Sequence, residues 1–256
     1  MRPRLDIVTV CLNAKSSISR CINSVRKDRM LINKFIVVDG GSTDGTLDIL
    51  KRNSDIISTL ISEKDKGISD AFNKGILKCN GDFVLLLNSD DWLLSGALEK
   101  VCACLSINDD IVCTTVTSYQ NSKSVGMFNS VPVLIPQFNS MLHPGAFVRR
   151  TLYESLGVYD VQLKVGMDYD FFCRCFINGC KFRIIKLPLV NFTEGGLSRK
   201  LKYKVFQESF YLRKKYFAAK IPFFETRQLV CRLIGDILYA IGLKSSVTKL
   251  LQILHE

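Results

Sequence analysis

The stretch GDFVLLLNSDD, residues 81–91, decides the fold. It contains Phe83–Leu87, an apolar run with the length and composition of a buried β-strand. The run ends at Asn88-Ser89-Asp90-Asp91, so the strand carries four oxygen-bearing side chains at its carboxyl end. The alternative interpretation is a polar turn in which Asp90 or Asp91 caps the following helix. The rest of the sequence decides between the two.

Three other apolar runs precede this strand, and segments with helical spacing separate them. The strands are predicted at residues 5–12, 35–38, 56–62 and 83–87, and the helices at 16–25, 44–52, 68–79 and 93–105. Strands that alternate with helices at this spacing predict an α/β fold, in which a mainly parallel sheet is flanked by helices on both faces. The pattern then weakens, and we expect strands at 111–117, 131–135 and 141–148 and a helix at 169–178.

The composition is that of an ordinary globular protein. The 256 residues are 47% apolar and 23% charged, so the chain can bury one sizeable core. No apolar stretch has the length of a membrane-spanning helix. The amino-terminal segment is too short and too polar for a signal peptide, and we expect a cytoplasmic protein. Ten cysteines without a Cys-x-x-Cys pair, beside only two histidines, indicate buried reduced thiols rather than zinc ligands.

The net charge of +11 is concentrated at the end of the chain. Residues 199–256 contain twelve Lys and Arg against four Asp and Glu, whereas residues 1–198 are nearly neutral. We therefore predict a main domain at 1–198 and a basic helical region at 199–256. Apolar residues of that region lie beside Arg227 and Arg232, which favours peripheral contact with the inner face of the cell membrane. Packing of these helices on the main domain is the alternative.

A basic chain can also bind nucleic acid. No recognisable binding module accompanies the charge, and the sequence has no stripe of interleaved aromatic and basic residues. We therefore expect no nucleic-acid partner.

Carboxylates occur at or just beyond the ends of three predicted strands. Asp39 precedes two glycines, which let the backbone approach a ligand while the carboxylate accepts hydrogen bonds from a base or ribose. Lys66 and Asp70 lie around a helix start, where anions are favoured. Ligands of open α/β sheets bind beyond the carboxyl ends of strands, so these segments and Asp90 are expected to meet in one crevice. Taken singly, a glycine turn and a solvated charged loop remain the alternatives.

The chemistry expected at Asp90 is metal-assisted binding of a diphosphate. Mg²⁺ and Mn²⁺ prefer carboxylates and substrate phosphates, so one or two protein carboxylates are enough when a diphosphate completes the coordination. The glycine turn after Asp39 is neither a Walker A loop nor Gly-x-Gly-x-x-Gly, which excludes a P-loop and the usual dinucleotide fingerprint.

Four segments together carry a family resemblance. The ordered set VTVCLNAK (8–15), VVDGGSTDGT (37–46), EKDKGISDAFNKG (63–75) and GDFVLLLNSDD (81–91) resembles the family 2 inverting glycosyltransferases with the GT-A fold, particularly bacterial members that build surface polysaccharide. The resemblance covers residues 4–195. It implies that the 1–198 domain is a GT-A catalytic domain.

The resemblance also implies roles for individual residues. Leu12, Asn13 and Asp39 would line the nucleobase and ribose pocket, and Lys66 and Asp70 would lie near the nucleotide. Asn88-Ser89-Asp90 would occupy the Asp-x-Asp position, with Asp90 as the metal ligand. His143, which precedes a proline, would lie near the donor diphosphate or the metal, and a packed loop residue is the alternative for it.

The sequence departs from the family pattern at two positions. Asn88 stands where many relatives carry Asp, so weaker metal affinity is expected while Asp90 remains intact. Met167 stands in place of the usual Glu, so only Asp168 is carried over as the base that takes the acceptor's proton. Asp170 competes with Asp168 for that role, and helix capping is the alternative for either.

These implications define the predicted function. A sugar, hexosyl or N-acetylhexosaminyl, would pass with inversion from a nucleotide-sugar donor, UDP-linked, to a saccharide or lipid-linked acceptor in polysaccharide biosynthesis. The cofactor would be Mg²⁺ or Mn²⁺. A nucleotide-sugar binding module with weak catalysis is the alternative, suggested by Asn88 and Met167.

Overall fold

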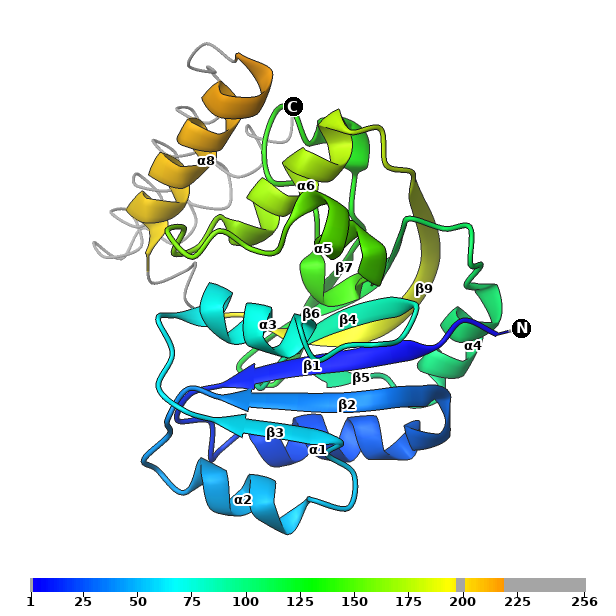
Figure 1. Ribbon diagram of the computed structural model, residues 1–256, viewed down its shortest axis with the longest axis vertical. Coiled ribbons are helices and arrows are strands. Elements are labelled where there is room, and N and C mark those ends of the chain that lie inside the picture. The colour runs from blue at the N-terminus through cyan, green and yellow to red at the C-terminus, as the bar shows by residue number, and fades with distance from the viewer. Residues whose placement is uncertain (1, 197–200, 219–256) are drawn as a thin grey trace.

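The computed structural model describes residues 2–196 and 201–218 (Figure 1). Residues 219–256 of the predicted basic helical region, with Arg227 and Arg232, lie outside the described residues. Among the residues that are described, no helix is long and apolar enough to cross a membrane.

The first half of the chain follows the predicted alternation. Its elements are β1 (Leu5–Cys11), α1 (Ile18–Lys27), β2 (Ile32–Asp39), α2 (Thr46–Arg52), β3 (Thr59–Ser62), α3 (Ile68–Ile76), β4 (Phe83–Asn88), the short β5 (Trp92–Leu93) and α4 (Ala97–Cys104). Strand β1 pairs in parallel with β2 and β4, and β2 pairs in parallel with β3. The carboxyl ends of β1, β2 and β4 therefore open toward the same edge of the sheet.

The second half extends the same sheet with mixed pairing. It contains β6 (Ile111–Gln120), β7 (Lys123–Phe128), β8 (Ala146–Arg149), α5 (Arg150–Leu156), α6 (Met167–Ile177), β9 (Phe182–Thr193) and α8 (Lys202–Phe217). The strand order is β3-β2-β1-β4-β8-β6-β9-β5, with β7 paired to β6. Strand β8 is antiparallel to both β4 and β6, whereas β9 is parallel to β6. The predicted α/β fold class is confirmed.

Two local predictions differ from the structure. The strand expected at 131–135 is a 3₁₀ turn at Pro132–Leu134, because Pro132 lacks the N–H that a ladder needs and suits the first turn of a helix instead. The segment 141–148 is divided between a 3₁₀ turn at His143–Gly145 and strand β8. That turn places His143 just before the first residue of β8 rather than within a strand.

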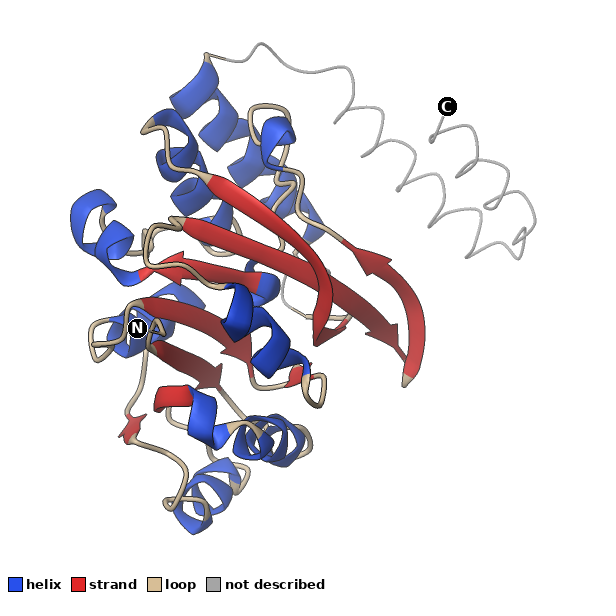
Figure 2. Ribbon diagram, turned by 90° about the vertical axis from the view of Figure 1, so that its right-hand side faces the viewer, coloured by secondary structure: helices blue, strands red, loops and turns tan. Residues whose placement is uncertain are grey.

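The core lies on both faces of the sheet. Along β1, Leu5 and Ile7 pack with α1 and α4 on one face. Val8 and Val10 pack on the opposite face with α3 and α6. Ile7 and Val8 are neighbours in the sequence but face opposite sides, because successive side chains of a strand alternate between the two faces of the sheet. Figure 1 shows α1 and α2 on one side of β1–β3 and α3 on the other, and Figure 2 shows the twisted sheet with helices on either side.

Candidate active site

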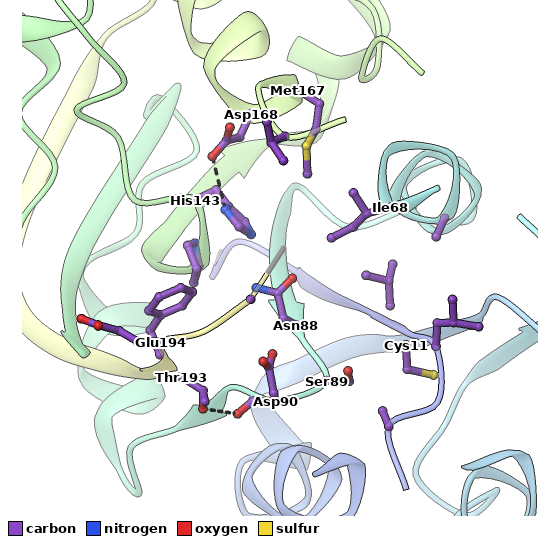
Figure 3. Close-up of a pocket in the computed structure, with 18 of the residues that line it drawn as sticks. Cys11, Ile68, Asn88, Ser89, Asp90, His143, Met167, Asp168, Thr193 and Glu194 are labelled. Atoms are coloured by element: carbon purple, nitrogen blue, oxygen red, sulfur yellow. Dashed lines mark hydrogen bonds and ion pairs between the residues drawn. The ribbon is translucent and has the colours of Figure 1, made fainter. Parts of the chain in front are cut away.

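A pocket of about 820 Å³ lies beyond the carboxyl ends of β1 and β4, within the size range of small-molecule sites. Its described walls come from the loops after these strands, from the 3₁₀ turn before β8, and from the start of α6 and the end of β9 (Figure 3). The predicted site residues that line it are Leu12, Asn13, Asn88, Ser89, Asp90, His143 and Asp168. Segments up to 156 residues apart in sequence are thus brought to one place, as the strand-end argument requires.

The two aspartates after β4 point in different directions. Asp91 is fully buried, its Oδ1 accepts a hydrogen bond from Thr193 N (2.8 Å), and its Oδ2 accepts one from Asn88 Nδ2 (2.9 Å). Burial, followed by the charge of Asp90, raises the pKa of Asp91 to about 7. Asp91 therefore ties the turn after β4 to the end of β9.

Asp90 presents its carboxylate to the pocket (Figure 3). Its backbone oxygen accepts hydrogen bonds from Arg20 Nη2 (2.9 Å) and Thr193 Oγ1 (2.7 Å), and these contacts fix the turn. Among the described residues, no other residue donates a hydrogen bond to its carboxylate. Burial raises the pKa of Asp90, against the opposing charge of Arg20, whose guanidinium stacks on Trp92 at 3.7 Å. The backbone contacts hold the turn in place, and the carboxylate itself lines the pocket.

Asp168 and His143 both line the pocket and form a pair. Asp168 Oδ2 lies 3.5 Å from His143 Nδ1, while Asp168 Oδ1 accepts hydrogen bonds from Tyr169 N (2.7 Å) and Asn139 Nδ2 (3.3 Å). His143 Nε2 is buried and has no hydrogen-bond partner within the described chain. Figure 3 shows the His143 ring below Asp168, on the side that faces Asn88.

Asp170 faces away from this pair and does not line the pocket. It is 2% exposed and contacts Arg174 Nε at 2.9 Å, Lys215 Nζ at 3.2 Å and Tyr216 Oη at 2.7 Å. Asp170 therefore joins α6 to α8 through a buried ion-pair network, which leaves Asp168 as the carboxylate of this helix that faces the pocket.

Three predicted site residues are absent from the described pocket wall, namely Asp39, Lys66 and Asp70. Asp39 is fully buried, and its carboxylate accepts hydrogen bonds from Ser62 Oγ (2.8 Å) and Ser42 N (3.2 Å). Asp70 Oδ2 accepts a hydrogen bond from Lys66 N (3.0 Å), and that bond, together with the charge of Lys74, lowers the pKa of Asp70. These carboxylates stabilise the two loops beside the pocket.

Other pocket residues escaped the sequence argument. Asn139 lines the pocket from a loop that carries no motif of its own, whereas Asp65 lies within the 63–75 segment but was not among the predicted site residues. Glu194 lines it from the end of β9, a strand that the apolar pattern does not reveal, so no sequence signal pointed to it.

The loop before Asp168 is held from α8. Glu208 is 5% exposed and its carboxylate accepts hydrogen bonds from the backbone N–H groups of Lys164 (2.9 Å), Val165 (2.9 Å) and Gly166 (2.8 Å). Three N–H groups aimed at one carboxylate make a charge-assisted clamp. The position of Asp168 thus depends on a helix that lies 40 residues further along the chain.

We expect Glu208→Ala to lower the free energy of unfolding by about 2–4 kcal/mol, because it leaves these buried N–H groups without an acceptor. Urea unfolding measures the loss. The matched control is Lys204→Ala, since the side chain of Lys204 is 43% exposed and lies 3.7 Å from Glu208, so the pair should contribute about 0–1 kcal/mol. Equal stability of the two variants would contradict the clamp.

Comparisons with known proteins agree with this geometry. Residues 6–158 match the model of glycosyl transferase family 2. The chain is 30% identical to a PGL/p-HBAD biosynthesis glycosyltransferase of Mycobacterium bovis, over 80% of this chain and 82% of that protein. Two solved structures share the fold at lower identity. S. aureus TarS in complex with UDP aligns with a TM-score of 0.68 and 18% identity, covering 92% of this chain and 72% of TarS. The Pyrobaculum calidifontis mannosyltransferase in complex with GDP-Man and Mn²⁺ aligns with a TM-score of 0.64 and 16% identity, covering 87% and 66%.

The match to the family model spans more than half of the chain, and the structural neighbours share its sheet and its flanking helices. The chain therefore belongs to glycosyl transferase family 2 and has the GT-A fold.

Proposed function

We propose that the protein is an inverting glycosyltransferase that moves a sugar from a UDP-linked donor to a hydroxyl of a saccharide or lipid-linked acceptor. The observation that carries this proposal is the presence of two unlike carboxylates in one pocket. Asp90 has a carboxylate without a hydrogen bond from any other described residue, whereas Asp168 is oriented by Asn139 and lies beside His143. The first suits a cation and the second suits a base.

Asp90 fits a divalent cation, Mg²⁺ or Mn²⁺. Burial opposes its negative charge, and a bound cation would relieve that cost. No cluster of three or more His, Cys, Asp and Glu residues suited to a metal occurs in the described ranges. The remaining ligands would then be water and the oxygens of the donor diphosphate, which is a common arrangement for Mg²⁺. A bound cation would supply charge neutralisation at the departing diphosphate.

The proposed chemistry at Asp168 is general base catalysis. The carboxylate takes the proton of the acceptor hydroxyl while that oxygen forms a bond to the anomeric carbon, on the face opposite the departing nucleoside diphosphate. A single displacement of this kind inverts the anomeric configuration. Asn139 and Tyr169 N–H both bond to Asp168 Oδ1, which leaves Oδ2 directed toward the pocket and His143.

The names of similar proteins support the substrate classes. TarS has been solved with UDP and with UDP-GlcNAc, and the archaeal mannosyltransferase with GDP-Man and Mn²⁺. The mycobacterial relatives are glycosyltransferases of PGL/p-HBAD biosynthesis. A hexosyl or N-acetylhexosaminyl donor and a glycolipid or polysaccharide acceptor agree with these names.

Transfer by the purified protein tests the proposal. The protein is incubated with Mn²⁺, a panel of UDP- and GDP-sugars and a set of saccharide and lipid-linked acceptors, and the anomeric configuration of the product is read by NMR. Inversion with a UDP-sugar is the expected result. Retention would contradict the single displacement, and donor binding without transfer or hydrolysis would favour a binding module.

The domain boundary at residue 198 and the contact with the membrane are both proposals. A truncated protein that tests the membrane contact has to retain α8. A truncation after Ser198 would remove Glu208 and with it the clamp on the loop 164–166. A chain ending at Ala218 keeps the clamp and removes residues 219–256, which contain five Lys and Arg.

We expect this truncation to weaken binding to vesicles of anionic phospholipid, by about 1 kcal/mol for each basic residue that contacts the surface. Flotation of the two proteins at low and high salt measures the difference. Equal flotation of the truncated and full-length proteins would remove residues 219–256 from any membrane contact.

A further inference from the structure

The carboxyl end of α6 closes in a Schellman motif, and cysteines occupy the two positions whose side chains meet in it. Cys180 N donates a hydrogen bond to Cys175 O at 3.0 Å, and Gly179 N donates one to Phe176 O at 3.1 Å. Gly179 has the left-handed backbone that the motif requires, with φ at +71°. The outer of the two hydrogen bonds joins residues whose side chains commonly contact each other. Here those residues are Cys175 and Cys180.

The backbone brings these two cysteines within the range of a disulfide. Because a 3.0 Å hydrogen bond joins the amide of Cys180 to the carbonyl of Cys175, standard bond lengths place the two α-carbons less than about 7 Å apart. The two side chains also hydrogen-bond to each other. Both cysteines are free thiols in this structure. The pair is therefore a dithiol that can close into a disulfide without a large movement of the backbone.

The two thiols differ in access and in acidity. Cys175 is 0% exposed, whereas Cys180 is only partly buried. The hydrogen bond that Cys175 donates lowers the pKa of the Cys180 thiol, and the same contact, together with burial, raises the pKa of Cys175. Thiols react with oxidants as thiolates and where solvent reaches them. An oxidant therefore meets Cys180 first, and Cys175 is the neighbour that resolves the product.

We propose that Cys175 and Cys180 are an oxidative modification site, at which hydrogen peroxide converts the dithiol to a disulfide. The Cys180 thiolate attacks one peroxide oxygen, the O–O bond breaks, and the departing hydroxide takes up the proton that Cys180 lost, which leaves a sulfenic acid and water. Cys175 Sγ then attacks Cys180 Sγ, the S–O bond breaks, and the hydroxyl leaves as water with the proton of Cys175. The two thiols lose two electrons and two protons, and one peroxide becomes two waters.

The disulfide would link two elements on which the proposed site depends, but it lies outside that site. Helix α6 carries Asp168 in its first turn, and β9, which begins just after Cys180, ends at Thr193 beside Asp90. Neither cysteine is among the described residues that line the pocket. A covalent link at this junction restricts the unfolded chain and opposes the opening of α6 from β9. We expect oxidation to raise the Tm of the full chain by about 2–8 °C.

Mass spectrometry tests the reaction directly, because trypsin releases both cysteines in one peptide. Cleavage after Arg174 and Lys181 gives residues 175–181, CFINGCK. The folded full-length protein is treated with hydrogen peroxide, catalase removes the excess, and the protein is then unfolded with an alkylating agent and digested. We expect this peptide to be lighter by two hydrogen atoms and to escape alkylation. Treatment with dithiothreitol before alkylation should restore both thiols.

Two variants separate the pair from the other cysteines. Cys180→Ser keeps a small hydrogen-bonding side chain at the end of the motif and removes one sulfur, so both the lighter peptide and the rise in Tm should disappear. Cys104→Ser is the matched control, because Cys104 is an exposed cysteine of α4. It should leave the peptide and the rise in Tm unchanged.

Three results would overturn the inference. The first is a peptide 175–181 that keeps two alkylatable thiols at peroxide concentrations that oxidise Cys104. The second is a sulfinic acid on Cys180 without any disulfide, since Cys175 would then be out of reach. The third is a disulfide that forms as fast in the urea-unfolded chain as in the folded protein, because the Schellman motif would then contribute nothing. None of these results depends on the proposed transfer reaction.

Discussion

Asp90→Asn is expected to reduce transfer by about three orders of magnitude, the scale on which a main electrostatic contact to the transition state acts. The substitution keeps the shape of the side chain and removes its charge. It also leaves intact the backbone oxygen that accepts hydrogen bonds from Arg20 and Thr193, so the turn should persist. Initial rates with a UDP-sugar at saturating Mn²⁺ measure the effect, and thermal unfolding checks that the fold is retained.

Asp91→Ala is the contrasting variant. It leaves Thr193 N–H and Asn88 Nδ2 without their buried acceptor, so the free energy of unfolding should fall by about 2–4 kcal/mol. Titration of Mn²⁺ in the presence of UDP should then separate the two positions, with the site lost in Asp90→Asn. Undiminished metal binding and turnover in Asp90→Asn would overturn the metal assignment.

Asp168→Asn should lower kcat by about 10²- to 10⁴-fold while the affinity for the donor stays nearly unchanged. The amide has no basic oxygen to take the acceptor's proton, but its carbonyl oxygen can still accept the hydrogen bonds from Tyr169 N and Asn139. Separate measurement of kcat, of KM for the acceptor and of the Kd for UDP distinguishes a lost base from a damaged pocket.

Asp170→Asn gives the complementary result. It weakens the contacts with Arg174, Lys215 and Tyr216 that join α6 to α8, so it should lower stability more than it lowers the rate of the chemical step in the folded protein. If Asp170→Asn abolished turnover at full stability while Asp168→Asn kept it, the base would have to be reassigned.

The fold was predictable where strands are buried on both faces. Such strands read as unbroken apolar runs, and β1, β2 and β4 were all located by this pattern. Strand β9 was not, because Arg183, Lys186 and Pro188 interrupt its apolar residues, and most of its first half is only partly buried. Its pairing with β6 also contains register shifts, so the strand shows no regular alternation of apolar and polar residues from which it could be predicted.

The site was predictable to the extent that strand topology determines it. The ends of β1 and β4 bring Asn13 and Asp90 into one pocket whatever their side chains do. The direction in which a carboxylate points is a different matter, since Asp39 turns inward to Ser42 and Ser62 and no local pattern distinguishes this from a ligand contact. The catalytic and binding roles of all these residues stay predictions for the experiments above.

The two residues that fix the turn and the loop of the proposed site are both synthesised late. Thr193 fixes the turn that carries Asp90, and Glu208 fixes the loop that carries Asp168. On the ribosome, β1 to β4 emerge and can pair long before either residue is available. A nascent chain that ends before these residues can therefore contain its central strands without the contacts that order the proposed site.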